Sequence, residues 1–156
     1  MREILFRGKR VDNGKWVYGG YYTDGKKHFI ITTVKHMPDT RDWDTVEYYE
    51  KNPTYLPDFK EVIPETVGQY TGLTDKNGKK IFEGDIIAYQ FFGEEHIDGV
   101  VKYGAFNCSC CDGVFGWYLD GGDIRRQEAE GECVSGNYVI GNIHDNPELL
   151  KGGANK

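Results

Sequence analysis

Long hydrophobic runs are absent from this chain of 156 residues. No stretch approaches the roughly 20 consecutive apolar residues that a membrane-spanning helix needs, so the sequence predicts none. The first residues, MREILFRGKRVDNG, hold one short apolar run and no small-residue cleavage site, which is not the pattern of a secretory signal peptide. Only four cysteines occur, and an intracellular protein would keep them reduced. We therefore expect a soluble, cytoplasmic protein.

Motifs that carry catalytic chemistry are missing as well. The chain contains neither the G-x-S-x-G frame of a serine nucleophile nor the G-x-x-x-x-G-K-[ST] loop that cradles phosphates. The acidic pairs Glu94-Glu95 and Asp42/Asp44 are interpreted as solvated loop residues, because nothing places a base or a lysine beside them. The histidines are scattered along the chain: His28, His36, His96 and His144. The sequence thus predicts no catalytic residue, no cofactor and no enzyme; an enzyme with an unrecognised site is our third hypothesis.

The cysteine spacing is poor for zinc. A closed structural site usually takes its ligands from two C-x₂₋₄-C knuckles, whereas this chain has one C-x-C-C cluster and a lone cysteine further on. Adjacent cysteines in an extended segment point to opposite faces. A mixed site would need His96 or His144 as a further ligand. We predict no metal and keep zinc as the alternative, with these ligands: Cys108, Cys110, Cys111 and Cys133.

Glycine and aromatic residues are abundant, with 21 Gly and 14% Phe, Trp and Tyr. Large rings bury much apolar area each, so a core can be built from few of them. WVYGGYY and HFIITTV are rich in the aromatic and β-branched residues that strands prefer. Asn13-Gly14 and Asp24-Gly25 are hairpin signals, and an Asn-Gly turn typically has positive φ at both residues. Residues 1–35 are therefore predicted to form an N-terminal antiparallel β-meander.

Residues 36–61 break this pattern with three prolines and many acidic residues. Trp43, Val46 and Tyr49 recur at spacings of three, which permits one or two helical turns. No continuous apolar face is evident. We interpret the segment as a long connection or insertion, and long connections often carry functional contacts.

Residues 62–150 are predicted to form an SH3-like small barrel. In KKIFEGDII, Gly84 permits a tight turn and Asp85 can accept hydrogen bonds from nearby backbone N–H groups. Another Asn-Gly hairpin, at Asn77-Gly78, precedes this turn, and a GVV strand follows it. A later hairpin has its expected tip at Asp112-Gly113.

The fold class is all-β: the barrel, the meander packed on it, and a short C-terminal helical turn. Asn146 is a good N-cap for that turn and Pro147 suits its first position. Residues 151–156 are expected to be a disordered tail. The parts are predicted to form one cooperative unit, because each alone is too small for a secure core.

Charge is spread unevenly around the net value of −6, since residues 1–36 hold eight Lys/Arg against three Asp/Glu. Such a basic arm suits phosphate or an acidic partner, although charges also segregate by chance on solvated strands. Aromatic rings lie among these cations, and bases can stack on exposed rings beside basic side chains. Nucleic-acid binding by the N-terminal sheet is therefore our second hypothesis. Alternation places half of the rings inside any sheet, and the net charge opposes binding to a polyanion. The candidate contact residues are Arg7, Lys9, Arg10, Lys15 and Trp16.

Three blocks of the sequence resemble one known family. PETVGQYTGLTDKNGKKIFEGDII (residues 64–87) is similar to the central signature of the YopX family of phage and prophage proteins, and REILFRGKRVDNGKWVYGGYY and YVIGNIHDNPELL resemble its two ends. The signature residues of this chain are Gly72, Asn77, Gly78, Gly84, Asp85, Gly141, Asn142 and Pro147. The resemblance implies a small, mostly β protein of bacteriophages or prophages, and it transfers no catalytic residue.

Our first hypothesis is a phage- or prophage-encoded, non-enzymatic binding protein of the bacterial cytoplasm, with an unknown biochemical role. Its partner is expected to be a host or phage protein, with contacts from residues 36–61 and 107–113. Edge strands left by a meander often pair between subunits, so a homo-oligomer is expected too. Nucleic acid is the less favoured partner, and a membrane is not expected.

Overall fold

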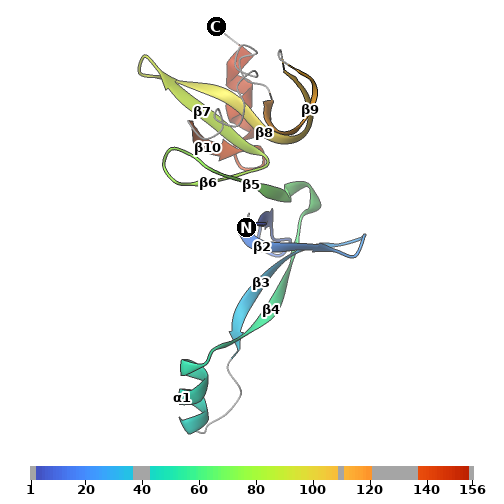
Figure 1. Ribbon diagram of the computed structural model, residues 1–156, viewed down its shortest axis with the longest axis vertical. Coiled ribbons are helices and arrows are strands. Elements are labelled where there is room, and N and C mark those ends of the chain that lie inside the picture. Colours follow the sequence, from blue (N-terminus) through green and yellow to red (C-terminus); the bar gives the residue numbers. More distant parts are fainter. Residues whose placement is uncertain (1–2, 37–42, 109–110, 121–136, 155–156) are drawn as a thin grey trace. The chain divides into compact units, whose positions relative to one another are not determined.

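The computed structural model describes residues 3–36, 43–108, 111–120 and 137–154, and the chain divides into two compact units. The N-terminal unit comprises residues 5–67. The C-terminal unit comprises residues 68–156 together with residues 1–4. Antiparallel strands dominate each unit (Figure 1), so the predicted all-β class is confirmed.

The N-terminal unit is an antiparallel meander with the strand order β4–β3–β2–β1. Its elements are β1 (Phe6–Lys9), β2 (Trp16–Thr23), β3 (His28–His36), α1 (Trp43–Lys51), β4 (Thr54–Val62) and the 3-10 helix η1 (Pro64–Thr66). The end of β4 also contacts the residues that follow β1. Val62 bridges Arg10, and the Ile63 amide donates a hydrogen bond to the Lys9 carbonyl.

Hairpins form at both Asn-Gly pairs, but with a different turn from the one predicted. Gly14 and Gly78 have positive φ, 67° and 79°, and Phe92 is the single non-glycine residue of the described chain in that region. Asn13 and Asn77 therefore do not have positive φ, and the prediction that both residues of each pair take it is wrong. Each loop is longer than two residues, so one left-handed glycine near its end suffices.

The described part of residues 36–61, a segment predicted as a connection, holds regular structure instead. β3 and β4 pair over all nine residues of each strand, and α1 lies beyond the end of this ribbon (Figure 1). The prolines misled the prediction because central strands exclude proline, whereas β4 is an outer strand that tolerates Pro57. The spacing of Trp43, Val46 and Tyr49 does correspond to a helix.

The core of the N-terminal unit is small and depends on close strand contacts. Ile30 and Val62 are fully buried. Gly8 lies against Val62, and an ideal Cβ there would be 3.0 Å from the valine Cβ. Gly19 lies against β3, where an ideal Cβ would be 2.1 Å from the Ile31 carbonyl oxygen. Glycine at these two positions lets the strands approach closely around the buried side chains.

The C-terminal unit combines a hairpin, β5–β6, with a 4-stranded antiparallel sheet in the order β10–β7–β8–β9. Its elements are β5 (Gly68–Thr74), β6 (Lys80–Phe82), β7 (Asp85–Phe91), β8 (Glu94–Cys108), β9 (Cys111–Asp120), β10 (Tyr138–Asn142) and the 3-10 helix η3 (Pro147–Ala154). Asp112 and Gly113, predicted at a hairpin tip, lie within β9.

The C-terminal helical turn begins at Pro147 as predicted, but it continues to Ala154. It therefore includes most of the tail that was predicted to be disordered from residue 151; residues 155–156 lie outside the described residues. Within the part of the chain that the structure describes, no helix combines the length and the apolar character that a membrane span requires.

Two layers of strands enclose the core of the C-terminal unit. Ile81 of the hairpin packs with Ile87 and Val101 of the sheet, and all three are fully buried. Partly buried neighbours complete the cluster: Leu73, Trp117, Leu119 and Val139. The sheet ends at β10 on one side and at β9 on the other, so no sheet of the described residues closes into a barrel. The predicted SH3-like barrel is not confirmed, because alternating strands and tight turns suit two packed layers equally well.

Gly84 and Asp85 form the turn between β6 and β7. Gly84 has a φ of 81°, and its amide donates to the Val101 carbonyl while its carbonyl accepts from the Ile143 amide. The buried Asp85 carboxylate accepts a hydrogen bond of 2.8 Å from the Phe82 amide. The turn thus ties three parts of the C-terminal unit together through its backbone.

Candidate functional site

The register of the N-terminal sheet gathers most of its rings on one side. Directly paired residues of antiparallel strands lie on the same face, as do residues two apart in one strand. Ile30 and Val62 mark the buried face, and we call the opposite one the outer face. The aromatic residues of the outer face are Trp16, Tyr18, Tyr22, Phe29, Tyr55 and Phe59, and its charged residues are Arg7, Lys9, Lys35 and Glu61.

Three rings of the outer face form a cluster. The ring centroids of Tyr22, Phe29 and Phe59 are separated by 6.2, 6.2 and 6.3 Å. Phe59 meets the other two rings edge-on, at 81° and 84°, which is a favoured aromatic geometry. Tyr22 and Phe59 are nevertheless 47% and 52% exposed. The cluster is therefore held by ring contacts and still presents ring surface to solvent.

Two cations of β1 lie close to the ring of Trp16. The guanidinium carbon of Arg7 is 4.7 Å from the indole centroid, and the Lys9 ammonium is 5.6 Å from it. Both distances are within the range of cation–π attraction. Arg7 is buried and orients the indole, whereas Tyr18, which pairs directly with Arg7, is 49% exposed. The structure thus brings together three of the predicted contact residues: Arg7, Lys9 and Trp16.

The other two predicted contact residues lie apart from that group. Arg10 forms a bidentate pair with Asp12, with an Nε–Oδ1 distance of 2.9 Å. It lines a depression together with Val11, Asp12, Phe59, Lys60 and Glu61. Lys15 is exposed in the turn before β2, where its amide donates to the Asn13 side chain. Arg10 therefore borders the outer face at Phe59, and Lys15 belongs to the hairpin turn.

Cationic residues outnumber acidic ones at the strand positions of the outer face. Glu61 is the single acidic residue among its strand positions, and its Oε2 lies 2.9 Å from the Lys27 ammonium. The hydrogen bond from Lys27 to Glu61 raises the pKa of Lys27, so the lysine stays charged and neutralises this carboxylate. Three cationic residues, Arg7, Lys9 and Lys35, share the strand positions of this face with that one carboxylate.

The family-signature residues shape turns and strand ends of the C-terminal unit. Gly72 in β5 has a φ of 91°. Gly141 and Asn142 end β10, where an ideal Cβ on Gly141 would lie 2.5 Å from the Asn146 side-chain oxygen. The Asn142 side chain accepts hydrogen bonds of 3.0 Å from the His144 and Asp145 amides. These positions have structural roles in the turn that leads to η3.

Asp75 is a residue that the sequence reasoning missed. It is buried, and its Oδ1 accepts hydrogen bonds from the Asn77 and Lys79 amides at 2.8 and 2.9 Å. Its Oδ2 accepts from the Val139 amide of β10 at 3.1 Å. The turn sequence TDKNG signals the local bonds. No sequence signal indicates the bond to Val139, which lies 64 residues away.

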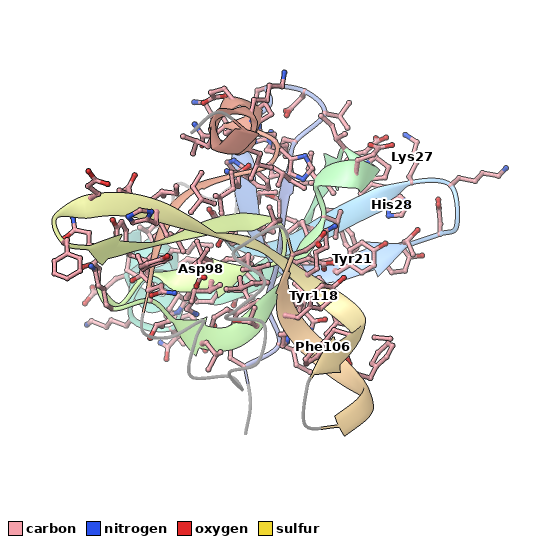
Figure 2. The ribbon with its side chains drawn as sticks, turned by 90° about the horizontal axis from the view of Figure 1, so that it is seen from above. Tyr21, Lys27, His28, Asp98, Phe106 and Tyr118 are labelled. Atoms are coloured by element: carbon pink, nitrogen blue, oxygen red, sulfur yellow. The ribbon has the colours of Figure 1, made fainter. Side chains whose placement is uncertain are left out.

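A second group of rings lies on the β8–β9 ribbon of the C-terminal unit. Tyr103 contacts Phe115 and Trp117 at centroid distances of 5.2 and 4.9 Å, and Phe115 is 66% exposed. Phe106 and Tyr118 stack at 5.5 Å across the two strands (Figure 2). The predicted contacts at residues 107–113 lie outside the residues whose side chains are described.

The side chains of Tyr21 and His28 form a hydrogen-bonded pair in the N-terminal unit. The Tyr21 hydroxyl and His28 Nδ1 lie 2.6 Å apart near Lys27 at the end of the β2–β3 hairpin (Figure 2). Phe6 covers Tyr21 at a centroid distance of 5.3 Å. The pair belongs to the buried face of the sheet, where a hydrogen bond satisfies the half-buried polar groups.

Metal chemistry has no described site. Among the residues that the structure describes, no group of three or more His, Cys, Asp or Glu residues is suited to hold an ion. The zinc alternative lies outside them: Cys110 and Cys133 are not described, and neither are the side chains of Cys108 and Cys111. The absence of a metal stays a prediction.

The fold and the outer face define a mostly β protein that presents a basic, ring-bearing surface on one antiparallel sheet. The family model for the YopX protein matches residues 5–151. This chain belongs to the YopX family, and the resemblance of the three sequence blocks is confirmed.

Among solved structures, the chain is similar to the crystal structure of protein EF1440 from Enterococcus faecalis, with 26% sequence identity and a TM-score of 0.46. The alignment covers 96% of this chain and 99% of the other. No curated protein matches the sequence significantly.

Proposed function

We propose that this YopX-family chain is a non-enzymatic binding protein, encoded by a phage or prophage and active in the bacterial cytoplasm, whose contact surface is the outer face. One observation carries the proposal: Tyr18, Tyr22 and Phe59 are each about half exposed on a single sheet face beside cations. Contiguous exposed rings mark interaction surfaces, and Tyr, Trp and Arg supply most binding hot spots. The phage context rests on the resemblance to the family and not on any feature of the site.

Ring removal tests this function. Immobilised protein is incubated with a lysate of bacteria in which a prophage has been induced, and the retained protein and nucleic acid are both quantified. Replacing Tyr22 and Phe59 by Ser is expected to lower the specifically retained material at least about fivefold, because exposed hot-spot rings contribute 1–2 kcal/mol or more each. Phe115→Ser, which removes an exposed ring from the other unit, is expected to retain as much as the wild type.

The amount of retained material is compared between the wild type, the variant without Tyr22 and Phe59, and Phe115→Ser. Circular dichroism and thermal unfolding show whether the ring variant keeps its fold. Equal retention by all three proteins, with the ring variant folded, would contradict the proposal.

We also propose that the protein is a homo-oligomer, as its edge strands lead us to expect. The β3–β4 ribbon supports this, because Val34 and the directly opposite Leu56 are both exposed, as is Tyr55. An isolated two-stranded ribbon with apolar side chains is marginally stable in water unless something covers it. Light scattering is expected to give a mass of at least two chains for the wild type and of one chain for a variant with Val34→Lys and Leu56→Lys. A monomeric wild type would refute this proposal.

A further inference from the structure

The outer face contains a gap between two exposed rings. Gly20 lies between Tyr18 and Tyr22 on the same face of β2 and pairs directly with Ile31. An ideal Cβ at Gly20 would meet nothing closer than the Ile31 Cβ, at 4.0 Å. Because a strand rises about 3.3 Å per residue, the two tyrosines are roughly 13 Å apart along it. No side chain of β2 therefore stands between the two rings on this face.

Charge complementarity favours an anionic ligand at this gap. Lys9 and Lys35 lie on the outer face, whose one strand carboxylate, Glu61, is paired with Lys27. Residues 5–67 contain ten Lys/Arg and ten Asp/Glu, so the whole net charge of −6 belongs to the C-terminal unit. The N-terminal unit by itself is therefore neutral, and its own charge does not oppose a polyanion at this face.

The open edge of the sheet disfavours an extended peptide. A peptide that adds as a strand needs a continuous row of free backbone donors and acceptors. The outer strand β4 carries Pro57, which lacks an N–H, and its end is already occupied, since the Glu61 carbonyl accepts from the Val11 amide. A ligand of this unit thus gains more from the ring-bearing face than from the edge.

We infer that the outer face binds single-stranded nucleic acid, DNA or RNA, with bases stacked on Tyr18, Tyr22 and Phe59 and with the phosphates near Lys9 and Lys35. This inference names the partner of the proposed binding function and rests on it. Stacking on aromatic side chains beside cations is the usual way in which proteins bind single strands without reading their sequence.

Fluorescence anisotropy with labelled oligothymidylate and oligouridylate tests the inference on the full-length protein. Both probes are expected to bind at low salt and to dissociate as salt rises. Tyr22→Ser is expected to weaken binding about tenfold. Gly20→Leu places a side chain between the two rings, its Cβ meeting nothing closer than 4.0 Å, and it is expected to weaken binding by a similar factor while the fold stays intact. Lys35→Ser is expected to reduce the salt dependence by about one phosphate contact.

Two control variants remove the same kinds of group elsewhere. Phe115→Ser and Lys79→Ser change an exposed ring and an exposed lysine of the C-terminal unit, and both are expected to bind like the wild type. A preference for one of the two oligonucleotides shows whether the DNA or the RNA probe is the better ligand.

The inference fails if neither oligonucleotide binds at low salt, or if binding is the same in the Gly20→Leu, Tyr22→Ser and Phe115→Ser proteins. The proposed function survives that failure if the lysate experiment still shows protein retained by the wild type and lost on removal of Tyr22 and Phe59. The proposed function fails together with the inference if the amount of material retained from the lysate does not change on removal of Tyr22 and Phe59.

Discussion

Gly19→Ala is expected to destabilise the N-terminal unit by about 3 kcal/mol or more, near or above the upper end of the usual overpacking range. An ideal Cβ at Gly19 would lie 2.1 Å from the Ile31 carbonyl oxygen and 2.9 Å from its carbonyl carbon. Both atoms belong to the backbone of the neighbouring strand, so no rotamer change can relieve the conflict. β2 and β3 would have to separate beside the buried Ile30.

Gly20→Ala is the matched control, one residue further along the same strand. An ideal Cβ at Gly20 has its nearest neighbour at 4.0 Å, and neither Gly19 nor Gly20 has positive φ. Alanine at this position is expected to be neutral or to stabilise by up to about 1 kcal/mol, because glycine loses more backbone freedom on folding. Urea unfolding followed by circular dichroism measures both variants. Equal unfolding midpoints for the two would show that the strands are not packed as described.

Asp75→Asn is expected to cost about 2 kcal/mol or more. The carboxylate of Asp75 accepts three backbone hydrogen bonds in a buried position, and the one from Val139 connects the β5–β6 loop with β10. An asparagine can accept two of these bonds with its oxygen but presents an NH₂ group to the third donor. A buried donor left without its acceptor costs about 1–3 kcal/mol.

The same substitution changes how stability depends on pH. Burial by itself would raise the pKa of Asp75, but the three amide donors outweigh it and hold the pKa below the ordinary value of 3.8. A carboxylate with a lowered folded-state pKa stabilises the fold above pH 3.8 and loses this contribution as the pH falls through its folded-state pKa. The stability difference between wild type and variant is therefore expected to be largest near neutral pH and to shrink in acid.

Asp24→Asn provides the comparison for that result. Asp24 also accepts two backbone hydrogen bonds in a turn, from Lys26 and Lys27, and its pKa is lowered by them. Asp24 is exposed, and its hydrogen bonds are local. Water can therefore accept a hydrogen bond from any backbone amide that the asparagine leaves without its acceptor. We expect a clearly smaller loss of stability than for Asp75→Asn. A loss at Asp24 as large as that at Asp75 would argue against the bond to Val139.

Local chemistry made much of the fold predictable. The aromatic and β-branched runs became strands, and glycine-bearing turns such as the one at Gly84 appeared where the sequence placed them. β4 was missed because Pro57 reads as a strand breaker, and its tolerance depends on the outer place of the strand. The barrel was predicted because turns and alternation do not distinguish a closed sheet from two packed layers.

The sequence also named part of the candidate site. Arg7, Lys9 and Trp16 were singled out, and they do lie together on the outer face. Phe59 was not, because it belongs to a segment interpreted as a connection. Its place beside Tyr22 follows from the pairing of β3 with β4, which joins residues far apart in the chain.

The sequence by itself determined the family, the predominance of strands and the positions of most turns, because these depend on residues that are neighbours along the chain. Only the tertiary structure decided which rings face solvent and that Asp75 reaches Val139. Alternation shows that Tyr18, Gly20 and Tyr22 share a face, but that face is the outer one because Ile30 and Val62 fill the core on the other side. That choice is set by packing between strands distant in sequence, and short-range patterns do not record it.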